Sequence, residues 1–194
     1  MSPALIPDIA DRPRPTDPVF FLLRPEPHAA RRVIRLAWQL RGENRLTGRP
    51  LAEEQLHVSL CDLGPFGRLT HAALGDIEEA ATSLAMPPFL VGFGWAESFG
   101  RTDQRRPVVL RGDDTLAGVM MLHDELVGAL RGIGLARRKA EFTPHMTLLY
   151  DRHNLRRRPI EEIRWTAREI VLVCSLHGRR RHVPLGRWPL SGRA

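Results

Sequence analysis

The sequence predicts an α+β fold that is bilobal, with two pseudo-symmetric, mainly antiparallel sheets lining a central cleft and helices outside. Two tetrapeptides, His57-Val58-Ser59-Leu60 and His145-Met146-Thr147-Leu148, share the order imidazole, apolar, hydroxyl, leucine and lie 88 positions apart. Each follows a strand–helix pattern as its closing strand. The distances from Phe20 to His57 and from Val108 to His145 are both 37 residues, which indicates a repeat. Alternating polar and apolar residues indicate strands with one buried face, which is typical of antiparallel sheets.

The first half of the pattern follows a proline-rich segment. Residues 1–18 contain five prolines and little apolar periodicity, so we expect a tail there and a single bilobal domain over residues 19–194. Residues 19–23 form a continuous apolar run, which predicts a buried strand. Apolar positions at helical spacing then predict an amphipathic helix over residues 28–41. A loop over residues 43–53 leads to the His57 strand.

The middle of the chain predicts two further helices and two strands. Thr70 is suited to cap a helix that ends before Pro87-Pro88. Residues 89–95 alternate like a strand, and residues 108–110 form a short apolar one. Apolar side chains at helical spacing from Leu116 to Leu130 predict the third helix, which begins after a capping residue among positions 113–115.

The last quarter of the chain predicts a hairpin. Residues 151–159 are polar and arginine-rich and are expected to form a loop. Residues 170–176 form an apolar strand, His177-Gly178 is a turn, and residues 182–190 return as its partner.

Composition indicates a water-soluble domain with an anionic partner. Hydrophobic residues make up 43% of the 194, and no apolar run approaches the ~18 residues of a membrane helix, so we expect no membrane contact. With no signal-peptide pattern, a cytoplasmic protein is expected. We also expect it to be a monomer. The formal net charge of +7 favours RNA or a nucleotide as partner. The alternative is compositional, since Lys139 is the only lysine among 29 basic residues and such a bias can reflect the coding genome.

The two tetrapeptides carry the chemistry. Side chains alternate along a strand, so His57 and Ser59 share one face while Val58 and Leu60 enter the core, and the second tetrapeptide repeats this. Adjacent strands would bring two imidazoles and two hydroxyls together, a set suited to acid–base chemistry on a phosphate. A metal site is not predicted, because no cysteine or carboxylate cluster and no His-Glu-x-x-His spacing accompanies the pair.

At these residues the chain resembles the two-histidine (2H) phosphoesterases, and in particular the LigT-type RNA 2′,3′-cyclic phosphodiesterases, also called 2′-5′ RNA ligases. That family carries two His-x-Thr/Ser-x motifs. Residues 56–64 are similar to its "LHxTLxFLG" run and residues 142–148 to its "FxPHxTL" run. The chain departs from the pattern in having Ser59 where threonine is usual and Cys61-Asp62 in place of an aromatic and an apolar residue. These departures leave the exact substrate open.

The resemblance implies a metal-independent, cofactor-free phosphodiesterase that opens a 2′,3′-cyclic phosphate on an RNA end or nucleotide to a 2′-phosphate, with 2′-5′ RNA ligation as a related activity. It implies that His57 and His145 are general acid and base, in either order. Ser59 and Thr147 would hold the non-bridging phosphate oxygens. The alternatives are a small-nucleotide cyclic phosphodiesterase and an RNA-binding module that keeps the fold with little turnover.

Three further residues are candidate substrate contacts. Arg106, or its neighbour Arg105, lies where the family often has a phosphate-binding arginine; the alternative is a plain solvated loop. Tyr150 lies two residues beyond Leu148, so the core is expected to take it, with base stacking at the groove edge as the alternative. Phe66 is expected to pack locally, with stacking on a base as its alternative. The basic run at residues 137–139 is either an RNA-facing edge or a solvated turn.

Overall fold

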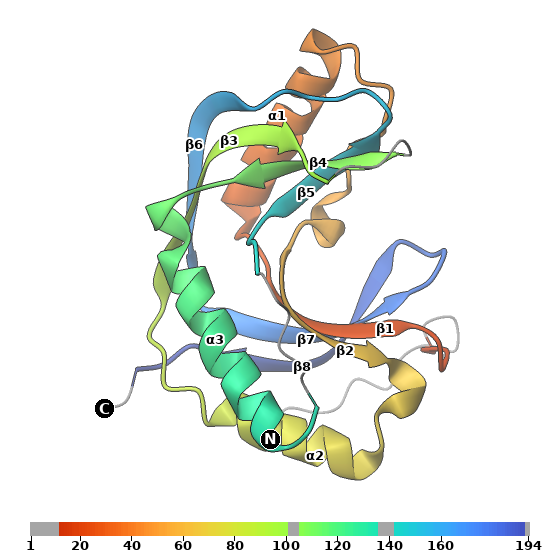
Figure 1. The fold of residues 1–194 in the computed structure, drawn as a ribbon, viewed down its shortest axis with the longest axis vertical. Helices are drawn as coiled ribbons and strands as arrows, with labels where there is room; N and C mark the ends of the chain where they lie inside the picture. The colour runs from red at the N-terminus through yellow and green to blue at the C-terminus, as the bar shows by residue number, and fades with distance from the viewer. Residues whose placement is uncertain (1–11, 101–104, 136–141, 193–194) are drawn as a thin grey trace.

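The computed structural model describes residues 12–100, 105–135 and 142–192, and within them the chain forms one eight-stranded sheet and three α-helices (Figure 1). Every strand pair is antiparallel, and the order across the sheet is β6-β3-β4-β5-β2-β1-β7-β8. The α+β, antiparallel prediction is confirmed. The strands are β1 (Pro18–Leu23), β2 (Val58–Pro65), β3 (Phe89–Ser98), β4 (Arg106–Arg111), β5 (Met146–Asp151), β6 (Arg158–Ala167), β7 (Glu169–Leu176) and β8 (Arg181–Pro189).

The predicted two sheets are two four-stranded halves of this one sheet. One half is β6-β3-β4-β5 and the other is β2-β1-β7-β8. A single residue pair, Val58 with Met146, joins β2 to β5 at the centre. We call this pair the junction. On either side of it the two halves separate, so each half presents its own wall.

The helices cross between the halves and cover them from outside (Figure 1). Helix α1 (Pro27–Glu43) follows β1 but packs on β5 and β6 of the other half. Helix α3 (Ala117–Gly132) follows β4 but packs on β2, beside α2 (His71–Thr82). Helices α1 and α3 thus each pack on the half opposite to the strand before them. The strand that follows each helix, β2 or β5, then lies at the centre of the sheet, where the two halves meet.

Most elements begin and end near their predicted positions. Thr70 caps α2, and its hydroxyl accepts a hydrogen bond from the Ala73 N–H at 3.1 Å. The main omission is β6, which begins where a loop was expected. Its buried side chains alternate only from Ile163 onward, after a charged start, and it lies at the sheet edge with β3 as its one partner. An edge strand needs less apolar patterning than a central one, so its sequence signal is weak.

A buried carboxylate fastens the loop after α1 to the end of β5. Asp151 is 1% exposed and accepts hydrogen bonds from the backbone N–H groups of Thr47 (2.6 Å), Gly48 (2.5 Å) and His153 (2.8 Å). A Cβ at Gly48 would collide with the carbonyl oxygen of Tyr150, so only glycine lets the loop approach this closely. Burial alone would raise the pKa of Asp151, but the donors from His153, Gly48 and Thr47 hold it well below its usual value.

Replacing Asp151 with asparagine should lower the free energy of unfolding by ~2–4 kcal/mol. One carboxylate oxygen becomes an NH₂ group, which faces backbone N–H donors and cannot accept their hydrogen bonds. The depressed carboxyl pKa adds a pH dependence: this stability is present above the unfolded pKa of 3.8 and is lost as the pH falls below it. Urea unfolding at pH 7 and pH 3 measures both effects. The exposed Asp124→Asn on α3 is the control, and equal stability of the two variants at pH 7 would contradict the prediction.

Candidate active site

The junction brings the four predicted polar side chains to one face of the sheet. Val58 and Met146 are fully buried, so the residues that flank them along each strand point the opposite way. Residues opposite one another in an antiparallel pair share a face. Extending the register of the junction by one residue in each direction places Thr147 beside His57 and His145 beside Ser59. Imidazole and hydroxyl therefore alternate around the junction, as predicted.

Both imidazoles are held in the same way. Each histidine immediately precedes its strand, and its Nδ1 lies against the backbone carbonyl two residues earlier: Gln55 at 2.7 Å for His57 and Thr143 at 2.8 Å for His145. A carbonyl only accepts, so Nδ1 carries a proton in both rings. Nε2 is then the nitrogen that takes up or gives a proton in chemistry.

The surroundings of His57 favour its neutral form. Burial lowers the pKa of His57 from 6.5 to about 4; the hydrogen bond to Gln55 opposes the shift, and the nearby charges of Arg24 and His145 reinforce it. The influence of His145 is that of a neighbouring charge, in agreement with the placement of both imidazoles at the junction. At neutral pH, His57 is therefore an imidazole ready to accept a proton.

Aromatic rings support each imidazole. The ring of Phe99 stacks on His145 with centroids 4.9 Å apart, and Phe20 lies 5.5 Å from His57. His182, from β8, meets His57 edge-on at 5.0 Å. Burial, together with His57 and Arg24, lowers the pKa of His182 to about 4. The sequence places His182 at the start of the returning strand and gives it no role in a site, because only the fold brings β8 toward the groove.

Two arginines flank the histidines, and sequence reasoning missed both. Arg24 follows Leu23, which pairs with Val58, and Arg111 follows Leu110, which pairs with Met146. Each therefore lies one strand away from a histidine, on the same face.

The two arginines are partly buried and only partly satisfied. The Nε of each is buried without a hydrogen-bond partner among the described residues. The Arg24 guanidinium donates to the Glu54 carbonyl at 2.6 Å, and that of Arg111 lies 3.5 Å from the Glu97 carboxylate. Burial lowers the pKa of Arg24. Each is the first charged residue after an apolar run, but the 88-residue repeat aligns Arg111 with Leu23, so the repeat in the sequence does not find the pair.

A cavity of about 950 Å³ opens beside the junction, on the side of Ser59 and His145. It fills the fork where β2 leaves β5, and α3 closes its back. Most of its lining is apolar. The described lining residues are Pro18, Phe20, Ser59, Leu60, Cys61, Asp62, Leu63, Gly64, Arg68, Leu69, Phe99, His123, Val127, Gly134, Leu135, Phe142, Thr143 and His145.

The other predicted contacts lie away from the junction. Arg106 is at the far end of β4, roughly 16 Å along the strand from Arg111, and donates to the Asn154 side chain at 3.2 Å. Phe66 packs against the core from a short 3-10 helix, as its local interpretation predicted. Residues 137–139 lie outside the described residues.

Tyr150 is 46% exposed, so its expected place in the core is wrong. A register shift between β4 and β5 at Val108/Val109 interrupts the alternation, and Leu148 and Leu149 are both buried before Tyr150 turns outward. Its exposure keeps the stacking alternative open.

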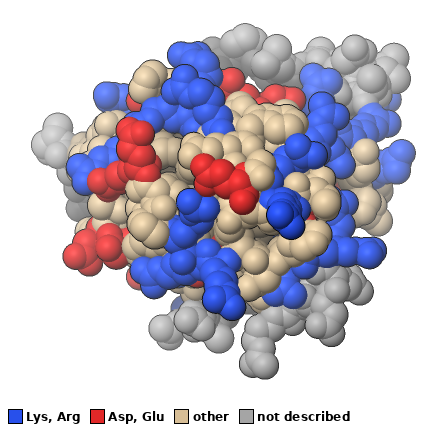
Figure 2. Space-filling model, turned by 90° about the horizontal axis from the view of Figure 1, so that it is seen from above, with Lys and Arg blue, Asp and Glu red and all other residues tan. Residues whose placement is uncertain are grey.

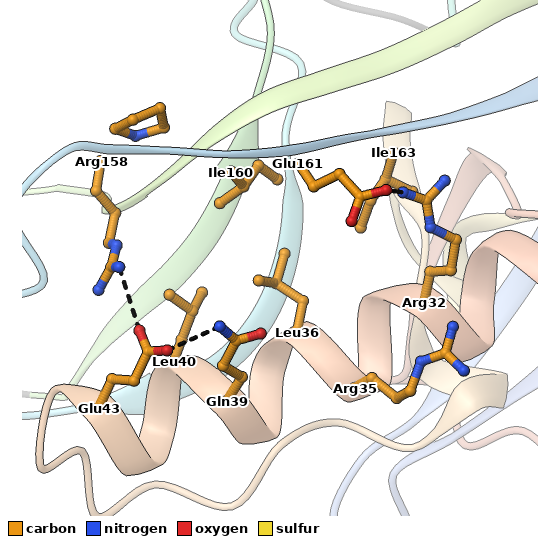
Figure 3. A pocket seen from close by; sticks show the side chains of 11 residues that line it. Arg32, Arg35, Leu36, Gln39, Leu40, Glu43, Arg158, Ile160, Glu161 and Ile163 are labelled. Carbon is orange, nitrogen blue, oxygen red and sulfur yellow. Dashed lines mark hydrogen bonds and ion pairs between the residues drawn. The ribbon is translucent and has the colours of Figure 1, made fainter.

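A second hollow, of about 310 Å³, lies between α1 and β6 on the outside of the sheet (Figure 3). Two of its three arginines pair with its two glutamates, with Arg32 2.7 Å from Glu161 and Arg158 3.1 Å from Glu43. No imidazole or hydroxyl lines it among the described residues. It therefore offers no chemistry comparable with that of the junction.

Surface charge alone does not delimit a site. Arginines spread across the face seen in Figure 2, with acidic side chains between them. Within the described ranges, no group of three or more His, Cys, Asp or Glu residues is arranged to hold a metal ion. No helix of the described chain is long and apolar enough to cross a membrane.

Comparison with known proteins identifies the same architecture. The family model described as "2′-5′ RNA ligase superfamily" matches residues 25–182. No curated protein matches the sequence. LigT of Escherichia coli in complex with 3′-AMP has a TM-score of 0.74 at 23% identity, over 90% of this chain and 98% of that one. A crystal structure described as a phosphoesterase has a TM-score of 0.73 at 24% identity, over 93% and 99%. A Thermus thermophilus protein has a TM-score of 0.74 at 18% identity, over 91% and 100%. At these identities the structural matches establish the fold.

Replacing Arg24 with glutamine should raise the pKa of His57 above its value of about 4, because a positive charge that disfavours the imidazolium is removed. Titration of the His57 ring by NMR measures the shift. Arg31→Gln, on the exposed face of α1, should leave this pKa unchanged. An unchanged or lower pKa in Arg24→Gln would show that Arg24 does not act on His57.

Proposed function

The chain belongs to the 2′-5′ RNA ligase superfamily, and from that premise we propose that it is a phosphodiesterase that opens a 2′,3′-cyclic phosphate at an RNA end to a 2′-phosphate. The observation that carries the proposal is the junction. One residue pair sets two imidazoles, two hydroxyls and two flanking arginines on one face of the sheet. A single phosphate placed over that face reaches an acid, a base and hydrogen-bond donors together.

We assign the base to His57 and the acid to His145. The neutral His57 takes a proton from water, whose oxygen attacks phosphorus. The bond from phosphorus to the ribose 3′-oxygen breaks, and the imidazolium of His145 gives that oxygen its proton. The phosphate stays on the 2′-oxygen. A second turnover requires only that the two histidines exchange the proton through solvent.

Two independent observations support this assignment. His57 has the lowered pKa, which suits a group that begins the reaction neutral. The cavity lies beside His145 and Ser59, so a ribose that enters it brings its leaving oxygen to the His145 side. Environment thus separates two chemically identical groups into an acid and a base.

The other polar groups stabilise charge. Ser59 and Thr147 donate hydrogen bonds to the non-bridging oxygens, which carry the charge that develops as water attacks. Arg24 and Arg111 provide positive charge from either side, and their incompletely satisfied guanidinium groups suit an anionic ligand. Nucleotides as the substrate class are supported by E. coli LigT, which has been crystallised with 3′-AMP, ATP and NADP+.

The same geometry supports 2′-5′ RNA ligation as a second activity, and the family description favours it. If a ribose 5′-hydroxyl replaces water, His57 takes its proton and its oxygen bonds to phosphorus. The 3′-oxygen leaves with a proton from His145, and a 2′-5′ phosphodiester remains. The groove face is accessible, since Ser59 is exposed, so a second strand end can approach opposite the cavity.

Replacing either His57 or His145 with alanine should lower kcat/KM on a cyclic-ended RNA by ~10²–10⁴-fold, because each removes one proton-transfer group. Product analysis should show a 2′-phosphate from the unaltered protein, with and without EDTA. The control is His71→Ala in the exposed first turn of α2, which should retain full activity. Loss of turnover in EDTA would contradict a metal-independent reaction. No turnover of cyclic RNA or cyclic mononucleotide, with RNA still bound, would instead indicate a binding module.

The pH profile tests the assignment of the base. If His57 is the base, kcat/KM should fall only as the pH approaches about 4, where its imidazole becomes protonated. Arg24→Gln should move this acidic limb upward, in step with the pKa of His57. An acidic limb that stays in place while the NMR pKa moves would assign the base to another group.

A further inference from the structure

His123 lies on the wall of the cavity. It comes from α3, is 8% exposed, and its Nδ1 lies 2.8 Å from the carbonyl oxygen of Leu60 on β2. Beyond Val58, the side of β2 that faces β5 has no strand partner among the described residues. The Leu60 carbonyl therefore needs a donor from elsewhere, and His123 supplies it.

The contact also fixes what the rest of the ring offers. Because the carbonyl only accepts, Nδ1 carries the proton, and Nε2 of the neutral ring is an acceptor. No described residue forms a hydrogen bond with Nε2, and Nε2 is not one of the fully buried atoms that lack a partner. Nε2 is therefore accessible, and His123 lines the cavity. The ring of Phe142 stacks on His123 at 3.7 Å with planes 7° apart, which holds the acceptor in place.

The remainder of the cavity suits a flat, largely apolar group attached to a phosphate. Ser59 and His145 line the cavity next to the junction, where the phosphate would react. Behind them the walls come mainly from leucine, valine and phenylalanine side chains. Ligand sites of roughly 300–1,000 Å³ typically combine such walls with a few fixed polar groups, and a volume of about 950 Å³ lies in that range. A nucleobase on the ribose that carries the phosphate has this shape and chemistry.

We propose that the cavity binds the terminal nucleobase of the substrate and that Nε2 of His123 accepts a hydrogen bond from its exocyclic amino group. The inference rests on the proposed phosphodiesterase function and adds a base preference to it. Adenine and cytosine carry an amino donor at C6 and C4, where guanine and uracil carry a carbonyl oxygen. A base that lacks this group leaves a buried acceptor unpaired, which a site of this kind penalises.

The test compares the 2′,3′-cyclic phosphates of adenosine and purine riboside, which differ only in the amino group. The unaltered protein should favour adenosine by at least ~10-fold in kcat/KM. His123→Asn keeps a side-chain donor for the Leu60 carbonyl but withdraws the imidazole acceptor from the cavity, so it should bring the ratio of the two kcat/KM values close to one. The matched control is Met121→Ala, an exposed side chain on the same helix, which should keep the preference.

A second measurement removes any dependence on the folding of the variant. Binding of adenosine 2′-phosphate should shift the ¹⁵N resonance of His123 Nε2 in the unaltered protein, and purine riboside 2′-phosphate should shift it much less. Turnover of both substrates with equal kcat/KM, or equal ¹⁵N shifts, would overturn the role of His123 while leaving the phosphodiesterase intact. Absence of turnover with either substrate would overturn the proposed function itself.

Discussion

The pairing of Val58 with Met146 is the contact on which the rest of the site depends. It is the one pair that joins β2 to β5, and its two side chains are completely buried. Because strand side chains alternate, burying these two obliges the neighbouring histidines and hydroxyls to face the groove. The same burial opposes any change of register. A one-residue slip of either strand would bury its polar side chains and expose its apolar ones. Core packing thereby positions the proposed catalytic groups.

The two halves repeat one plan, and the proposed mechanism requires that they differ. Each half contributes a histidine whose Nδ1 is tied to a carbonyl, a hydroxyl two residues later, and an arginine on the adjacent strand. In the proposed mechanism one imidazole acts as the acid and the other as the base. Burial and Arg24 hold His57 neutral, whereas His145 borders the cavity. The two histidines therefore differ in their surroundings, because different elements pack beside each of them. The repeated motif itself is the same in both halves.

The motif and the order of elements were predictable because both are local. Alternation around His57 and His145 identifies their strands, and the equal 37-residue spacings indicate the repeat. Arg24, His182 and His123 could not be assigned from sequence, since their roles depend on strands and a helix that are distant in the chain. Tyr150 was misplaced because a register shift breaks the alternation on which the prediction relied. β6 was missed because its charged first residues conceal an edge strand.

A fork in a sheet creates a site because it leaves backbone groups that need partners. Where β2 and β5 separate, each loses the ladder that would satisfy its inner edge. On one side the Leu51 N–H donates to the Leu148 carbonyl at 2.8 Å, and loop residues cover β5. On the other side a side chain, His123, serves the Leu60 carbonyl and lines the cavity. An imidazole differs from a backbone N–H in having a second nitrogen. The group that completes the edge of β2 therefore also presents an acceptor to whatever enters the fork, which links the architecture of the sheet to the recognition of its ligand.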